Sequence, residues 1–253
     1  AHRDAVLLDT ALFARVKRIY DRRDALGLDA EQRHLVERQY EDFVRGGALL
    51  AEAAKARLRA LNEELSTLST QFAIKVLAGT KAAAPVYERA DLAGLSDRDV
   101  DAAAEAAKQR GMPGKYVLVL QNTTQQPAQA LLANRAARQR LFQASVHRND
   151  RGDSNDTRAI VQRIVQLRAE QARLLGFPTY SAFALDNQLA KDPDSAIALL
   201  TQLAAPATAK ARREAVAIQA LIDRQGGGFK LEPWDRQYYA EQVRHAEYEV
   251  DDT

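Results

Sequence analysis

Apolar side chains in the first 80 residues recur every three or four positions, which is the spacing of one face of an α-helix. One such stretch covers residues 10–26, and Gly27 after it is a typical helix end. A second begins after Asp29, and Gln32 three positions later predicts a capping box. A third and longer helix is predicted over about 48–77. The pattern therefore indicates three successive helices.

The third predicted helix has leucines and one phenylalanine at alternating intervals of three and four, as in a coiled coil: Leu58, Leu61, Leu65, Leu68 and Phe72. Only Gly46 and Gly47 separate the second helix from it. We therefore expect these two helices to form a long antiparallel pair, with the leucine row in a structural role.

Residues 80–120 change character. Val86-Tyr87 and the run 116–120 are β-branched, aromatic or apolar and predict two short strands. Between them lies a short helix, with Ser96 as its cap and Asp99 at the third position after it. We expect a small two-stranded element and no extensive sheet.

Helical periodicity returns after Pro127, which suits the first turn of a helix running to about Val146. Further helices are predicted after a cap at Asn155 or Asp156, over about 180–185, over about 193–224, and after Pro233. The fold class is thus mainly α, with the small β element around 86–120. We expect three regions: a long helical hairpin at 1–79, a small α/β insertion at 80–126 and a helical bundle at 127–253.

Composition limits the class of protein. The 253 residues are 46% hydrophobic and 28% charged, values typical of a globular chain. Cysteine is absent, which excludes disulfides, thiolate zinc sites and a cysteine nucleophile. With 36 basic and 34 acidic residues, the net charge of +2 gives no reason to expect a nucleic acid. Because no apolar run approaches about 20 residues, we expect no membrane protein. We expect a cytoplasmic protein, with the periplasm as the alternative compartment, since the lack of cysteine is compatible with both.

No catalytic motif can be read from the residues. The histidines are His2, His34, His147 and His245, and none has another at i+3 or i+4. The polar stretch 149–156 has the wrong ligand spacing for a calcium loop and is interpreted as a solvated turn and helix cap. No G-x-S-x-G is present, so a hydrolase triad has no support. We therefore name no catalytic, cofactor-binding or metal residue.

Two charged stretches are interpreted as helix surface. The basic stretch Arg135, Arg138, Arg140 and Arg148 lacks the interleaved aromatic rings of a single-strand nucleic-acid site and is expected to be solvated or ion-paired. The adjacent Glu63 and Glu64 show no sign of shared burial.

Four segments in order resemble the thimet-oligopeptidase family of zinc metallopeptidases. They are Pro233-Trp234-Asp235-Arg236-Gln237-Tyr238-Tyr239 (P-W-D-x-x-Y-Y), residues 167–177 (L-R-x-E-x-A-x-L-L-G-[YF]), Asn134-Arg135 with Arg138 (N-R-x-x-R), and Tyr40, Phe43, Gly47 and Leu50 (Y-x-x-F-x-x-x-G-x-x-L). The resemblance covers nearly the whole chain and leans towards the bacterial peptidyl-dipeptidase branch over the endopeptidase branch.

The resemblance implies a large, mostly helical, two-lobed enzyme that binds one zinc through an H-E-x-x-H helix and a downstream glutamate. In the peptidyl-dipeptidase branch, such an enzyme removes dipeptides from the carboxyl end of peptides. In family order the zinc helix lies well beyond the P-W-D segment, so no position here receives the zinc ligands or the base. We therefore expect a non-catalytic, N-terminal-side portion of one lobe, whose partners in the full-length parent are the catalytic region and the peptide substrate.

The alternative is a self-standing helical module, derived from that family, that binds peptides or a protein partner. The two interpretations differ in one structural expectation. In a portion of a larger enzyme, Trp234, Tyr238 and Tyr239 would pack on a missing region and form an exposed apolar patch. In a module, the chain's own residues would cover these rings.

Overall fold

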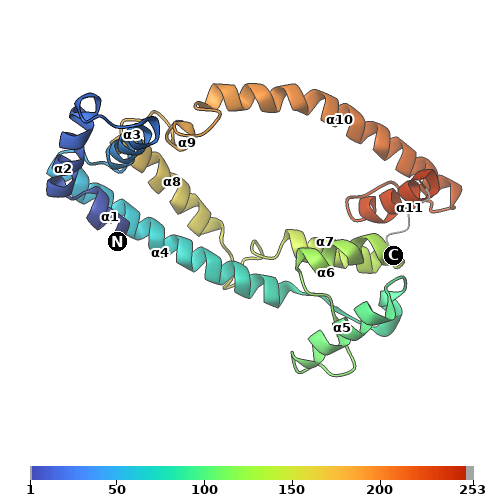
Figure 1. The fold of residues 1–253 in the computed structure, drawn as a ribbon. Coiled ribbons are helices and arrows are strands. Elements are labelled where there is room, and N and C mark those ends of the chain that lie inside the picture. The colour runs from blue at the N-terminus through green and yellow to red at the C-terminus, as the bar shows by residue number, and fades with distance from the viewer. Residues whose placement is uncertain (1, 249–253) are drawn as a thin grey trace. The chain divides into compact units, whose positions relative to one another are not determined.

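The computed structural model describes residues 2–248, and this part of the chain is mainly helical with one two-stranded sheet (Figure 1). The fold class expected from the sequence is therefore confirmed. The helices are α1 (His2–Leu7), α2 (Thr10–Asp21), α3 (Ala30–Arg45), α4 (Glu52–Ala83), α5 (Asp97–Lys108), α6 (Asn122–Leu131), α7 (Arg135–Val146), α8 (Arg158–Leu174), α9 (Tyr180–Leu185), α10 (Pro193–Arg224) and α11 (Arg236–Tyr248). The strands are β1 (Val86–Tyr87) and β2 (Tyr116–Val117), and short 3-10 turns lie at Arg23–Ala25 and Arg89–Leu92.

The contacts between residues group the chain into two compact units. Unit 1 contains Ala1–Phe72 and Ala159–Ile197, and unit 2 contains Ala73–Arg158 and Ala198–Thr253. Each unit thus joins two segments that are distant in the sequence. The expected division at 1–79, 80–126 and 127–253, as parts of one lobe, stays a prediction.

In unit 1, aromatic rings join α2 and α3. The ring of Phe13 stacks on those of Tyr40 and Phe43 at centroid distances of 5.8 and 5.9 Å. The expected capping box is confirmed, since the Asp29 carboxylate accepts from the Gln32 N–H and the Gln32 side chain accepts from the Asp29 N–H. The aromatic face of α3 thus packs on α2, not on α4 as the short two-glycine connection led us to expect.

Gly47 explains how the chain leaves α3. Its φ is +96°, a conformation that residues with a Cβ rarely adopt. A Cβ at this position would also lie 2.6 Å from the Leu58 side chain of α4. The glycine therefore lets the chain turn at a close approach and begin α4 in a new direction.

In unit 2, a core forms around the two strands. β1 and β2 are antiparallel, with Val86 opposite Val117 and Tyr87 opposite Tyr116. The predicted strand run 116–120 pairs only over its first two residues, but Leu118 and Leu120 beyond it are buried. The buried Tyr87 hydroxyl donates to the Ala137 carbonyl at 3.0 Å, which fixes α7 against the sheet.

The single helix predicted from Pro127 to Val146 is wrong: the structure has α6 and α7 with a break at 132–134. At the break, the Ala133 N–H donates to the Ala93 carbonyl at 2.8 Å. The Asn134 side chain then caps α7 by accepting from the Ala136 and Ala137 N–H groups. A local cap and a distant backbone partner therefore outweigh continuous helical periodicity.

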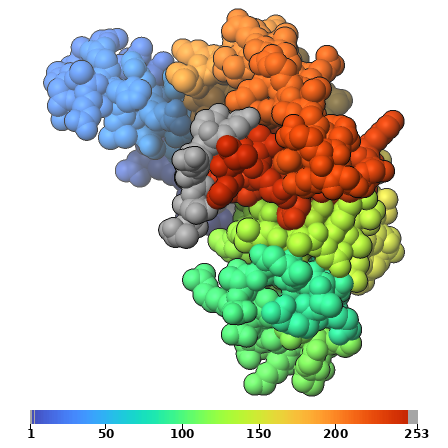
Figure 2. Space-filling model, turned by 90° about the vertical axis from the view of Figure 1, so that its right-hand side faces the viewer, coloured from blue at the N-terminus to red at the C-terminus, as the bar shows by residue number. Residues whose placement is uncertain are grey.

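The long helix α10 is largely exposed in its N-terminal two thirds. Leu199, Leu200 and Leu203 are each more than half exposed. Figure 2 shows this orange helix at the surface of the view, above the red α11. None of the described helices combines the length and the apolar character needed to cross a membrane.

Candidate functional site

Two of the motif segments, N-R-x-x-R and P-W-D, meet in unit 2 at a buried ion-pair cluster. Asp235, fully buried, accepts from Arg135 Nη2 at 2.9 Å and from Arg138 Nη2 at 3.1 Å. The Arg138 side chain is 1% exposed, and its Nη1 also donates to the Leu132 and Ala133 carbonyls. The expectation of an ion-paired basic stretch is confirmed for Arg135 and Arg138, but Arg138 lies in the interior and is not solvated.

This cluster holds α11 against α6 and α7. The buried Gln129 side chain donates to the Arg138 carbonyl at 3.1 Å and to the Trp234 carbonyl at 3.0 Å. Figure 2 shows the red α11 lying directly on the lime-coloured α6 and α7. The cluster therefore has a structural role that joins segments about 100 residues apart.

The expected exposed patch of Trp234, Tyr238 and Tyr239 is wrong. Tyr239 is 7% exposed and contacts the rings of Phe229 and Tyr238, and the Trp234 ring makes an edge contact with Phe142 at 6.3 Å. The Arg138 guanidinium covers the Tyr238 ring at 4.0 Å. Residues of unit 2 itself therefore cover these rings. The helix end expected after Tyr248 lies outside the described residues.

None of the described histidine side chains belongs to a group that could hold a metal ion. His34 and His147 are exposed on α3 and at the end of α7, and His147 Nδ1 lies 3.1 Å from the Asp150 carboxylate. His2 and His245 are exposed on α1 and α11. Among the side chains that the structure describes (those of residues 2 and 4–246), no group of three or more histidine, aspartate or glutamate residues is arranged to hold a metal ion.

Hydrogen bonds within the polar stretch 149–156, and one to α4, hold it in a turn. The Asn149 side chain donates to the Lys75 and Asn155 carbonyls, both at 2.9 Å. The Asp156 carboxylate accepts from the Arg158 side chain and N–H, which lowers its pKa. These bonds match the expected turn and helix cap, although α8 begins two residues after Asp156.

The other two motif segments lie in unit 1 and flank a cavity. The segment 167–177 forms the end of α8, where Gly176 with φ +88° follows the last turn. Phe177 beyond it makes an edge contact with Phe183 of α9 at 5.3 Å. On α8 itself, Arg168, Gln171 and Leu175 follow an i, i+3, i+7 spacing and therefore face one side.

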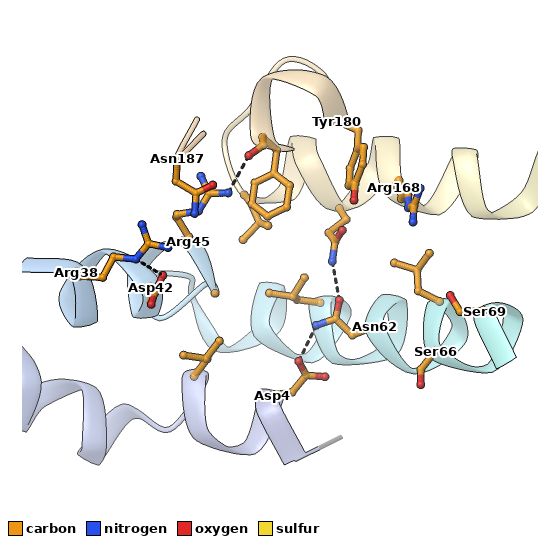
Figure 3. A pocket seen from close by; sticks show the side chains of 17 residues that line it. Asp4, Arg38, Asp42, Arg45, Asn62, Ser66, Ser69, Arg168, Tyr180 and Asn187 are labelled. Atoms are coloured by element: carbon orange, nitrogen blue, oxygen red, sulfur yellow. Dashed lines mark hydrogen bonds and ion pairs between the residues drawn. The ribbon is translucent and has the colours of Figure 1, made fainter. Parts of the chain in front are cut away.

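The cavity has a volume of about 600 Å³ and lies between α4 and the α8–α9 segment (Figure 3). On α4 the lining residues recur at the spacing of one helix face. The lining includes both polar and apolar side chains, among them Asp4, Arg38, Asp42, Arg45, Leu58, Asn62, Leu65, Ser66, Ser69, Arg168, Gln171, Leu175 and Tyr180.

Polar bridges cross the middle of the cavity (Figure 3). Asn62 Nδ2 donates to Asp4 Oδ1 at 2.8 Å, and Gln171 Nε2 donates to Asn62 Oδ1 at 2.7 Å. Outside the cavity, Arg57 and Glu170 form a further pair between α4 and α8, and the hydrogen bond from Arg57 lowers the pKa of Glu170. These bridges connect the two helices while the space between them remains open.

Most of the cavity's charges are already paired. Arg45 pairs with Asp186 and donates to the Phe183 carbonyl at 2.8 Å, and Arg38 lies 3.5 Å from the Asp42 carboxylate. Arg168 is the exception among the cavity's arginines. Its guanidinium lies 5.0 Å from the centroid of the Tyr180 ring, and no described carboxylate pairs with it.

Sequence reasoning named no site residue and did not find this cavity. Asp4, Asn62 and Gln171 are 58 and 109 positions apart and belong to no common motif. The segment 167–177 contains three lining residues, Arg168, Gln171 and Leu175, and the leucine row of α4 contains Leu58 and Leu65. Neither pattern indicated a cavity.

Comparison with known proteins gives matches over both units. Residues 129–253 match the family described as Peptidase family M3. The chain is 46% identical over 248 residues to a dipeptidyl carboxypeptidase of Escherichia coli, covering 98% of this chain and 36% of that protein. It is 45% identical to the dipeptidyl carboxypeptidase of Salmonella typhimurium over the same shares, and 29% identical to an oligopeptidase A of Haemophilus influenzae over 87% of this chain and 33% of that protein. The chain thus spans about a third of the length of these relatives.

Proposed function

Since this chain belongs to peptidase family M3, on its dipeptidyl carboxypeptidase side, we propose that it is a non-catalytic portion of a zinc peptidyl-dipeptidase. In the parent, such an enzyme would remove dipeptides from the carboxyl end of peptides, and this chain would lie on the N-terminal side of the zinc-binding region. The identity of 46% over nearly the whole chain carries the proposal.

The described residues do not fit a zinc ion. A catalytic zinc site needs three protein ligands, usually histidines and one carboxylate, that converge on an open position. His34 lies in unit 1 and His147 in unit 2, and the His147 ring is next to Asp150 alone. We therefore assign the zinc of the parent to residues outside this chain.

In the parent, this chain would form a stable support for the zinc-binding region. In unit 2, the cluster of Arg135, Arg138 and Asp235 fixes α11 in position. The exposed leucines of α10, such as Leu199 and Leu203, offer an apolar surface on which we place the contact with the catalytic region. We place the protein in the cytoplasm, with the periplasm as the alternative compartment.

The proposal is tested with an N-blocked tripeptide that has a free carboxyl end. The purified chain, supplied with zinc, should release no dipeptide above the rate of a chelator-treated sample, since its described residues hold no metal site that would activate water. Release that requires zinc and follows the chain through purification would contradict the proposal.

The second candidate function is a self-standing module that binds peptides or a protein partner. One observation favours it: the rings of Trp234, Tyr238 and Tyr239 are covered by unit 2 itself. A module should unfold reversibly and remain monomeric at high concentration. Analytical ultracentrifugation with the parent's separately produced zinc-binding region distinguishes the two candidates: a portion of a larger enzyme should form a complex with that region, and a self-standing module should not.

A further inference from the structure

The cluster that joins α6, α7 and α11 contains three buried side-chain atoms that have no hydrogen-bond partner among the described residues. They are Gln129 Oε1, Arg138 Nε and Trp234 Nε1. Gln129 is 2% exposed and Arg138 is 1% exposed. Buried polar atoms in proteins are almost always hydrogen-bonded, because a polar atom that loses water without a replacement destabilises the fold. These three atoms therefore require a partner that the described side chains do not supply.

The three atoms belong to residues that meet at one side-chain amide. Gln129 Nε2 donates to the Arg138 carbonyl at 3.1 Å and to the Trp234 carbonyl at 3.0 Å. These two bonds fix the orientation of the amide, because turning it over would place Oε1 against two other acceptors. Gln129 Oε1 therefore stays at the other end of the same amide and requires a donor.

The guanidinium of Arg138 is also fixed in direction. Its Nη1 donates to the Leu132 and Ala133 carbonyls, and its Nη2 donates to Asp235 Oδ1 at 3.1 Å. Because a guanidinium is planar, these bonds leave the Nε–H group no freedom to turn towards another acceptor. The indole nitrogen of Trp234 can only donate. The unpaired set thus consists of one acceptor and two donors.

We propose that unit 2 binds one water molecule in its interior, which donates to Gln129 Oε1 and accepts from Arg138 Nε and Trp234 Nε1. Water both donates and accepts hydrogen bonds, and a buried water molecule typically makes about three of them. The bound water completes the link between the N-R-x-x-R and P-W-D segments. This proposal depends on neither function above.

A halide ion is the competing occupant, because Arg135, Arg138 and Asp235 together carry one net positive charge. A halide accepts hydrogen bonds but donates none, so it would leave Gln129 Oε1 unpaired. It would also bring a second negative charge into a cluster that already holds the buried Asp235 carboxylate. The mixture of donors and an acceptor therefore favours water.

The first test follows the indole N–H of Trp234 by NMR in the full 253-residue chain. This group gives a single indole resonance, because Trp234 is the only tryptophan. We expect a cross-peak between the indole proton and water in a rotating-frame Overhauser experiment, with the sign of a dipolar contact and not of proton exchange. The laboratory-frame cross-peak should have the opposite sign, which indicates a water molecule that tumbles with the protein.

Two variants give the matched comparison. Gln129→Met removes the acceptor of the water molecule and keeps a side chain of similar length, so the cross-peak should be lost. Gln219→Met is the control within unit 2. Both ends of the Gln219 amide are bonded within the chain, since Nε2 donates to the Phe229 carbonyl and Oε1 accepts from the Leu231 N–H. This control should keep the cross-peak of the unchanged chain.

A crystal structure of the unchanged chain, grown in sodium bromide, identifies the occupant without relying on a variant. Density for a water molecule within hydrogen-bonding distance of all three atoms, with no anomalous bromide signal, would support the proposal. A bromide peak, empty density, or direct bonds among the three atoms would overturn it. Absence of the water cross-peak in the unchanged chain, or its persistence in Gln129→Met, would overturn it in solution. None of these outcomes involves hydrolysis, so failure of this proposal is distinguishable from failure of the proposed function.

Discussion

Replacing Asp235 by asparagine removes one charge from the interior of unit 2 with almost no change of shape. The carboxylate is fully buried and pairs with Arg138, whose side chain is 1% exposed, and with Arg135, which is 35% exposed. In the variant, the Arg138 charge stays buried without its partner. Removing one member of a buried pair typically costs 3–5 kcal/mol, so we expect a loss of about 3 kcal/mol in the free energy of unfolding, since asparagine still accepts a hydrogen bond.

Urea unfolding followed by Trp234 fluorescence measures this loss locally. Trp234 is the only tryptophan of the chain and precedes Asp235, so its emission reports unit 2. Glu214→Gln is the matched control within unit 2, because Glu214 pairs with Arg236 at 3.1 Å while both side chains are more than 40% exposed. An exposed pair of this kind contributes about 0–1 kcal/mol.

A loss for Asp235→Asn no larger than that of the control would refute the interpretation of the cluster as a buried structural anchor. The double replacement Arg138→Met with Asp235→Leu gives a second check. Since a buried ion pair replaced by apolar side chains often leaves stability unchanged, the double variant should recover much of the loss.

Three further replacements test the packing of the core. Tyr87→Phe should cost about 1 kcal/mol by removing the hydrogen bond to the Ala137 carbonyl. Burial raises the pKa of the Tyr87 hydroxyl, so the stability that Tyr87 adds to the folded state is complete below its unfolded pKa of about 10 and is lost as the pH rises above that value. In denaturant titrations between pH 8 and 11, the free energy of unfolding should therefore fall less steeply in the variant than in the unchanged chain. Gly94→Ala should lower the free energy of unfolding, measured by calorimetry, by about 3 kcal/mol or more, because φ is +98° and the new Cβ would lie 2.1 Å from the Leu131 carbonyl oxygen. The control Gly152→Ala is also at positive φ but in open space, and should lower it by about 1 kcal/mol. Leu61 is 0% exposed, so Leu61→Ala should lower the free energy of unfolding in urea by about 2–5 kcal/mol. Leu77 on the same helix is 75% exposed, so Leu77→Ala should lower it by about 0.5 kcal/mol or less. Equal losses would contradict the assigned burial.

Local signals in the sequence predicted the helices well where a cap or a stop lies within a few residues. The Asp29–Gln32 capping box, the Ser96 cap and the end of α8 before Gly176 are of this kind. The break between α6 and α7 was missed, because it depends on a bond from Ala133 to the carbonyl of Ala93, 40 residues earlier. A hydrogen bond to a residue so distant does not change the local spacing of apolar residues, from which the helix was predicted.

The packing of exposed-looking residues was harder to predict. Arg138 belongs to a basic stretch whose sequence predicts an exposed helix face. Its side chain is buried because it pairs with Asp235, which lies 97 positions later in the chain. The motifs N-R-x-x-R and P-W-D marked both residues without indicating that they touch. The cavity of unit 1 was missed for the same reason, since Asn62 and Gln171 are ordinary polar residues until α4 and α8 face each other.

The zinc content of the purified chain tests the central claim most directly. The chain is treated with chelator, dialysed, supplied with one equivalent of zinc and desalted, and the metal is then counted by elemental mass spectrometry. A non-catalytic portion of a zinc peptidyl-dipeptidase should retain close to zero zinc per chain. Retention of about one tightly bound zinc per chain would contradict the account, because a ligand set would then exist within these 253 residues.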